Sequence, residues 1–105
     1  LLTQGEDGRP HAVAVSIEWQ GDRILTSTGT RSVSNVAARP LVSLLWPPID
    51  TGGYSLIVDG DGRVIGSGSA VRVSVTPTRG VLHRPGVSAG SAARGCGSDC
   101  IPLLG

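Results

Sequence analysis

The chain has 105 residues, enough for one domain, and its formal net charge of +1 is too balanced for a nucleic-acid-binding protein. All nine basic residues are arginines, so the lysines of a Walker phosphate loop and of a Schiff-base enzyme are both absent. The aromatic residues are two tryptophans and one tyrosine, so aliphatic side chains must fill the core. β-Branched residues favour strands, and so small a core is stabilised more easily in a dimer.

No apolar run approaches the roughly 20 residues of a membrane helix, and the sequence does not open on a basic-then-apolar signal. The absence of an initiator methionine is typical of a trimmed fragment. We therefore expect a soluble, cytoplasmic protein that has neither a membrane nor a nucleic-acid partner.

Residues 11–19 predict the first strand. Val13, Val15, Ile17 and Trp19 alternate with small or polar residues, so all four fall on one face of an extended chain. We expect this face to point into the core.

A turn, a strand, a short helix and another strand follow. Residues 20–23 predict a tight turn, and residues 24–29 predict a strand that forms a hairpin with the first one. Residues 32–39 predict two helical turns, which Pro40 ends because the residue before a proline avoids helical geometry. The nearly continuous apolar run 41–46 predicts a central strand.

Residues 54–66 predict a second hairpin. Two apolar runs flank the Asp59-Gly60 and Asp61-Gly62 pairs, and Asp-Gly supplies the positive-φ residues of a tight turn.

Residues 70–75 and 79–85 predict two further strands, separated by Pro77. About six strands and one short helix predict an all-β domain over residues 1–85, a small barrel or sandwich. Residues 86–105 are rich in glycine, serine and alanine and predict a tail.

The two cysteines, Cys96 and Cys100, lie in this tail. With His11 and His83 they could form a zinc site, and alternatively they could form a local disulfide. Thiols without a special role are favoured over both, so we expect no metal.

The strand-to-helix junction concentrates hydroxyl side chains around Arg31. Thr30 or Ser32 is suited to cap the helix, but neither has Glu or Gln three residues on, so a capping box is absent. A helix N-terminus offers unpaired N–H groups and the positive end of a dipole, and an arginine adds a charge-assisted contact. From the residues alone, a plain polar turn is favoured over a phosphate site.

The order of these features resembles the split-barrel flavin and deazaflavin oxidoreductases, which are related to pyridoxamine phosphate oxidase. The resemblance covers most of residues 8–85 and rests on "GRPHAVAVSIEW", "DRILTSTGTRSVSNVAARPLVSLLW" and "SLIVDGDGRVI". It implies an all-β fold with one short helix, a six-stranded split β-barrel of the FMN-binding type. It also implies a homodimer that holds FMN or a deazaflavin coenzyme between its subunits.

The resemblance further implies that the coenzyme phosphate rests on the turn before the short helix. By position, the residues implicated are Thr26, Ser27, Thr28, Thr30, Arg31, Ser32 and Asn35. Many relatives carry a second base where this chain has Ser32. Trp46 is a candidate wall for the coenzyme ring, although a place in the core or in a dimer interface is favoured for it.

The resulting expectation is an oxidoreductase in which the bound coenzyme passes a hydride to or from a small or planar substrate. The sequence identifies no catalytic acid or base. Two alternatives stay open: a non-catalytic module that binds a flavin or another phosphorylated ligand, and a structural barrel with an empty groove.

Overall fold

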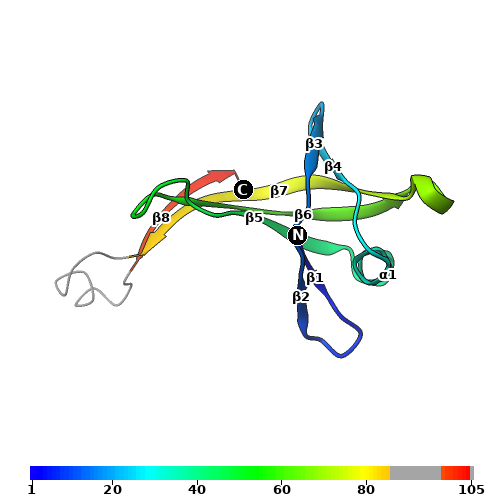
Figure 1. Ribbon diagram of the computed structural model, residues 1–105. Coiled ribbons are helices and arrows are strands. Elements are labelled where there is room, and N and C mark those ends of the chain that lie inside the picture. Colours follow the sequence, from blue (N-terminus) through cyan, green and yellow to red (C-terminus); the bar gives the residue numbers. More distant parts are fainter. Residues whose placement is uncertain (86–97, 105) are drawn as a thin grey trace.

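The computed structural model describes residues 1–85 and 98–104 and consists mostly of antiparallel β-sheet with one α-helix, which confirms the all-β prediction (Figure 1). The elements in chain order are β1 (Leu2–Gln4), β2 (Pro10–Ala12), β3 (Ile17–Gln20), β4 (Arg23–Thr26), α1 (Thr30–Ala38), β5 (Leu41–Trp46), β6 (Ser55–Ile65), the 3₁₀ turn η1 (Gly68–Ala70), β7 (Arg72–Pro85) and β8 (Ser98–Leu104).

The sheet has the order β2-β1-β5-β6-β7-β4-β3, and β8 also pairs with β7. Its two end strands, β2 and β3, are consecutive in the chain and are joined by residues 13–16. This segment is tied at both ends, because Val13 N–H donates to the Leu1 carbonyl (3.0 Å) and Thr26 Oγ1 donates to the Ser16 carbonyl (2.8 Å). Among the described residues, no ladder between strands closes the sheet.

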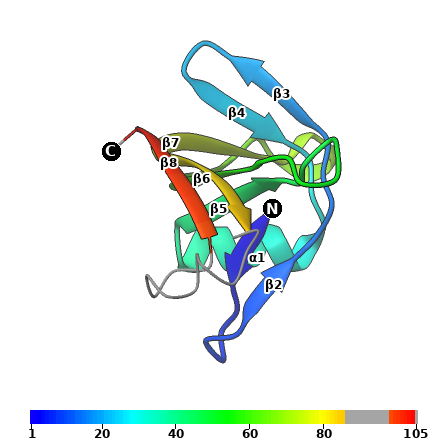
Figure 2. The same cartoon turned by 90° about the vertical axis from the view of Figure 1, so that its left-hand side faces the viewer.

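The long strands β6 and β7 form the axis of the molecule (Figure 1). The β3–β4 hairpin stands on one side of this axis, and the β1–β2 hairpin lies on the opposite side, near α1 (Figure 2). The core lies where these parts meet, and its buried aliphatic residues are Leu1, Ile24, Val36, Val42, Leu44, Val73 and Val75.

Helix α1 packs closely on β6 because Gly62 lacks a side chain. A Cβ at Gly62 would lie 2.9 Å from Val36 Cγ1 of the helix and 3.2 Å from Val42 Cγ1 of β5. Val36 is 2% exposed and is the apolar anchor of the helix. This packing holds α1 against β5 and β6.

The predicted hairpin at residues 54–66 is wrong, since β6 runs unbroken from Ser55 to Ile65. Neither Gly60 nor Gly62 has a positive φ, and the chain instead reverses at Gly66 (φ 75°) and Gly68 (φ 58°). Gly60 serves close packing, because a Cβ there would lie 2.6 Å from the Thr76 carbonyl oxygen of β7.

The two predicted strands at residues 70–75 and 79–85 are joined in β7, which passes through Pro77. The register with β6 shifts at this point, so the proline lies next to a β-bulge. Part of the predicted tail, residues 98–104, forms β8 and pairs with the end of β7. Whether residues 1–85 form a domain by themselves stays a prediction.

The predicted first strand is split into β2 and β3 because its pairing partner changes from β1 to β4. Val13, Val15 and Ile17 pack against the core as expected. Trp19 does not, since it lies on the projecting β3–β4 hairpin and is 57% exposed. Strand β1 was not predicted.

Candidate functional site

The N-terminus of α1 has no side-chain cap. Gly29 occupies the N-cap position, so the prediction of Thr30 or Ser32 as the cap is wrong. No acidic residue lies in the first turn, and Val33 N–H donates to the Gly29 carbonyl (3.1 Å). The first N–H groups of a helix have no acceptor within the helix, so this end offers donors and a positive dipole.

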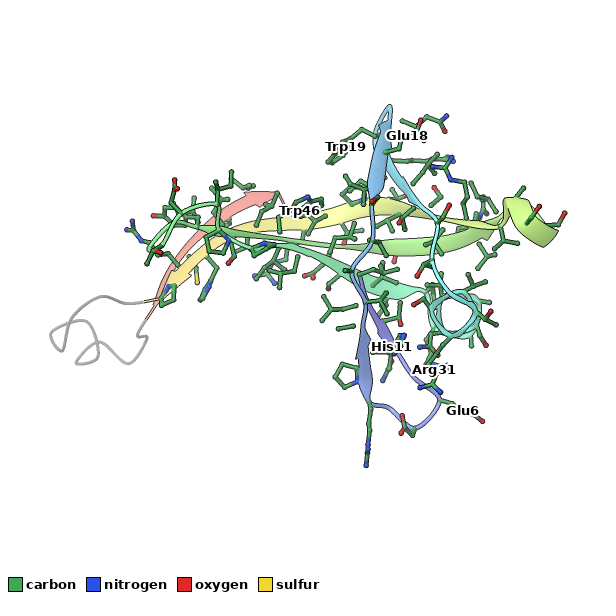
Figure 3. All side chains as sticks on the ribbon, in the orientation of Figure 1. Glu6, His11, Glu18, Trp19, Arg31 and Trp46 are labelled. Atoms are coloured by element: carbon green, nitrogen blue, oxygen red, sulfur yellow. The ribbon has the colours of Figure 1, made fainter. Side chains whose placement is uncertain are left out.

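An open hollow lies between this helix end and the loop of the β1–β2 hairpin. The helix side contributes Thr30, Arg31, Ser34 and Asn35, and the loop side contributes Gly5, Glu6 and Asp7. The Arg31 side chain is exposed and extends from the helix toward the loop that carries Glu6 (Figure 3).

The charges in the hollow are mixed. Arg31 is its one base among the described residues, and the loop adds the carboxylates of Glu6 and Asp7. Asp7 is engaged within the loop, because its Oδ1 accepts from Arg9 N–H (3.0 Å) and its Oδ2 lies 3.6 Å from Arg9 Nε. Glu6 adds a further negative charge to the lining, which lowers the affinity of the hollow for an anion.

Two of the predicted hydroxyls are buried away from the hollow. Thr26 is 1% exposed and donates to the Ser16 carbonyl. Ser32 is also 1% exposed, and its Oγ has no hydrogen-bond partner among the described residues. Neither hydroxyl lines the hollow.

Asn35 lines the hollow but is buried and already bonded. Its Nδ2 donates to Thr3 Oγ1 (3.1 Å), and its Oδ1 accepts from Arg39 Nη2 (3.4 Å). Arg39 also donates from Nε to the Gln4 carbonyl (2.7 Å). These bonds tie the helix to β1, so Asn35 positions the helix end as well as lining the hollow.

The other predicted residues divide between the hollow and a separate pocket. Ser27 is exposed and Thr28 half-buried just before the helix, and neither lines the hollow. Trp46 ends β5, packs on the core and lines a different pocket with Val15 and Pro47. Figure 3 shows Trp46 and Arg31 on different parts of the molecule, so one chain does not bring them together.

Glu6 and Asp7 were not predicted as site residues from the sequence. They lie far from Arg31 along the chain, and the β1–β2 hairpin brings them to the helix. Only the unpredicted strand β1 could have indicated this approach.

In the part of the chain that the structure describes, His83 and Cys100 are cross-strand neighbours on β7 and β8. No group of three or more metal-ligating side chains occurs there. Cys100 is exposed on β8, and Cys96 lies outside the described residues.

No helix in the described ranges is long and apolar enough to cross a bilayer.

Comparison with known proteins identifies mycobacterial relatives whose names state no activity. No protein-family model matches the chain. Uncharacterized protein Mb0449c of Mycobacterium bovis is 37% identical over 115 aligned residues, which cover 96% of this chain and 81% of the relative. Uncharacterized protein MT0457 of Mycobacterium tuberculosis matches with the same identity and coverage. The chain therefore belongs to the same family as these two mycobacterial proteins.

Proposed function

We propose that the protein is a flavin- or deazaflavin-dependent oxidoreductase of the split-barrel type, acting in the cytoplasm on a small or planar substrate. The observation that carries the proposal is the uncapped N-terminus of α1 with the exposed Arg31 in its first turn. The sheet has eight strands rather than the six expected, but its order supports a split barrel, because the two end strands are consecutive and their connection bonds to Leu1 and to Thr26 of β4.

The residues of the hollow fit a coenzyme phosphate in part. Backbone N–H groups and Arg31 supply donors of the right kind, and Thr30 and Ser34 add hydroxyls. Glu6 opposes a dianion, and buried Ser32 leaves no room for a second base at its position. The phosphate would thus be held by one guanidinium, two hydroxyls and the helix end.

A bound flavin or deazaflavin supplies the hydride chemistry itself. The chain's residues bind and orient it: α1 presents its N–H groups and Arg31, while Asn35 and Arg39 fix the helix against β1. We assign no residue as a catalytic acid or base.

We further propose a homodimer with the coenzyme between its subunits, because the sheet carries apolar residues on both faces where β5 to β8 pair. Cross-strand neighbours share a face of a sheet. The register places Trp46, Leu56, Leu82 and Ile101 in one row and Leu45, Ile57, Val81 and Pro102 in the adjacent row, on the other face. Leu45 is 50% exposed and Ile101 39% exposed, so each row includes apolar surface that a partner would cover.

The test is a titration of the purified protein with FMN and, separately, with the deazaflavin coenzyme, followed by absorbance and calorimetry. Arg31→Ala should weaken binding by about 1–3 kcal/mol if the guanidinium pairs with the phosphate. Arg23→Ala is the matched control, because Arg23 is also exposed but lies on β4 and does not line the hollow. A wild-type protein that binds neither coenzyme would refute the proposal.

A non-catalytic carrier of a phosphorylated ligand is the second candidate. Glu6 in the hollow and the lack of a second base favour it, because both lower the affinity expected for a resident coenzyme. Turnover with an added electron acceptor distinguishes the two: coenzyme binding without turnover supports the carrier.

A further inference from the structure

A second groove, distinct from the hollow at the helix, lies between the β1–β2 hairpin and strands β5 to β7. Its volume is about 470 Å³, and its walls include Leu2, Pro10, Leu41, Ser43, Asp59 and Thr78. That volume is within the range of about 300–1,000 Å³ typical of small-molecule sites. Asp59 is the one charged side chain among the described residues that line it.

Asp59 occupies an unusual position for an aspartate. It lies inside β6, which pairs with β5 on one side and β7 on the other. Aspartate is depleted in strands because its short polar side chain packs poorly there. Its neighbours across the strands are Ser43 on β5 and Arg79 on β7, and Leu2 of β1 lies beyond Ser43.

A β-bulge lies in β7 beside Asp59. Asp59 pairs with Arg79 while Gly60 pairs with Pro77, so Thr78 is the extra residue of β7. The Thr78 hydroxyl donates to the Asp59 backbone carbonyl (3.3 Å), which ties the bulge to β6. Bulges re-aim side chains and occur often beside functional sites.

The carboxylate of Asp59 keeps capacity to accept a further hydrogen bond. Its Oδ1 accepts from Ser43 Oγ (2.5 Å). Its Oδ2 lies 3.6 Å from Arg79 Nη1, too long for a good hydrogen bond, and the two side chains are 40% and 59% exposed. Such an exposed ion pair is weak, so a ligand can displace Arg79 from Oδ2.

We propose that this groove binds a small primary amine with an apolar body. Its ammonium group donates to Asp59 Oδ2, and its apolar body lies against Leu41 and Pro10. Leu41 is 73% exposed, so the apolar wall is available to a ligand. This site is independent of the proposed coenzyme site, since it shares no lining residue with the hollow at the helix.

The experiment is an NMR titration of the ¹⁵N-labelled protein with benzylamine, with benzyl alcohol and benzoate as the neutral and anionic analogues. Benzylamine should shift the amide signals of Leu41, Ser43, Asp59 and Thr78 at millimolar concentrations. Benzyl alcohol should bind several-fold more weakly, and benzoate should leave these signals in place. Equal binding of all three compounds, or shifts elsewhere only, would overturn the proposal.

Asp59→Asn should weaken benzylamine binding by about tenfold, because the charge of the acceptor is lost. Asp22→Asn is the matched control: it removes the same charge from the exposed turn between β3 and β4, outside the groove lining, and should change the affinity less than about twofold. If the two substitutions weakened benzylamine binding equally, the binding would reflect a general attraction between charges, and the proposed site would be refuted.

Leu41→Ser keeps the proposal testable if Asp59→Asn does not fold, because Leu41 is exposed and its replacement should not disturb the sheet. It should weaken benzylamine binding several-fold through the lost apolar contact. Unchanged affinity would contradict the assigned wall.

Discussion

Ser32 shows how burial separates residues that adjoin in sequence. Arg31 is exposed in the first turn of α1, whereas the next residue has its hydroxyl in the core without a partner among the described residues. A buried, unpaired hydroxyl costs about 1–3 kcal/mol. Ser32→Ala should therefore leave the free energy of unfolding unchanged or raise it by about 1 kcal/mol, measured by urea denaturation.

The control for this prediction is Ser34→Ala, because Ser34 is exposed on the same helix and reports helix propensity alone. FMN affinity should not change in Ser32→Ala. A clear loss of stability in Ser32→Ala would show that the Ser32 hydroxyl has a partner. A loss of FMN affinity without a loss of stability would show that this hydroxyl contacts the ligand.

Gly29 permits a sharper test of the helix end. It has extended geometry (φ −72°, ψ 169°), and a Cβ there would meet nothing within 4 Å, so another residue fits without strain. Gly29→Asp should cap the helix and stabilise the fold by up to about 1 kcal/mol. The same carboxylate should weaken FMN binding at least tenfold, because it occupies the N–H groups and repels the phosphate.

Gly29→Ala is the control that distinguishes the effect of the added charge from the effect of adding any side chain. It should lower stability slightly and leave FMN affinity nearly unchanged, since alanine is a poor cap but carries no charge. If Gly29→Asp stabilises the fold while FMN binds as before, the phosphate does not rest on this helix.

Strands β6 and β7 owe their close pairing to Gly60. A Cβ at this position would lie 2.6 Å from the Thr76 carbonyl oxygen, and the backbone of a paired strand cannot move aside cheaply. Gly60→Ala should lower the free energy of unfolding by about 1–3 kcal/mol in urea denaturation. Gly62→Ala should cost less, since its nearest contact is the movable side-chain methyl of Val36. A larger loss of stability in Gly62→Ala than in Gly60→Ala would contradict this account of the close pairing of β6 and β7.

At the scale of the whole molecule, the apolar rows on β5 to β8 predict self-association. Leu45→Glu should shift a wild-type dimer toward monomer in sedimentation equilibrium, because a charge in the centre of an apolar interface is costly to desolvate. Leu41→Glu is the control: Leu41 is at least as exposed and lies at the other end of β5. A monomeric wild-type protein at micromolar concentration would contradict the dimer.

Local patterns were sufficient for part of the fold. Continuous apolar character predicted β5, and alternation correctly placed Val13, Val15 and Ile17 toward the core. The hydroxyl-rich junction correctly indicated a short helix before Pro40, although α1 begins at Thr30 rather than at Ser32 and so includes Arg31. In these segments the burial of each side chain depends on its position along its own strand or helix, so the spacing of apolar residues in the sequence is enough to predict which side chains are buried.

The Asp-Gly pairs of β6 mark the limit of such patterns. A glycine can supply a positive φ or permit close approach, and its sequence neighbourhood is the same in both cases. Which one applies at Gly60 depends on β7, which meets it from more than a dozen residues away.

The sequence by itself determined an all-β chain with one short helix that begins at a polar turn. Only the tertiary structure decided that Ser32 is buried, that Glu6 and Arg31 line the same hollow and that Asp59 lines a groove. The physical reason is that strand pairing joins segments remote in the chain. A side chain's charge environment is therefore set by neighbours that local periodicity does not encode.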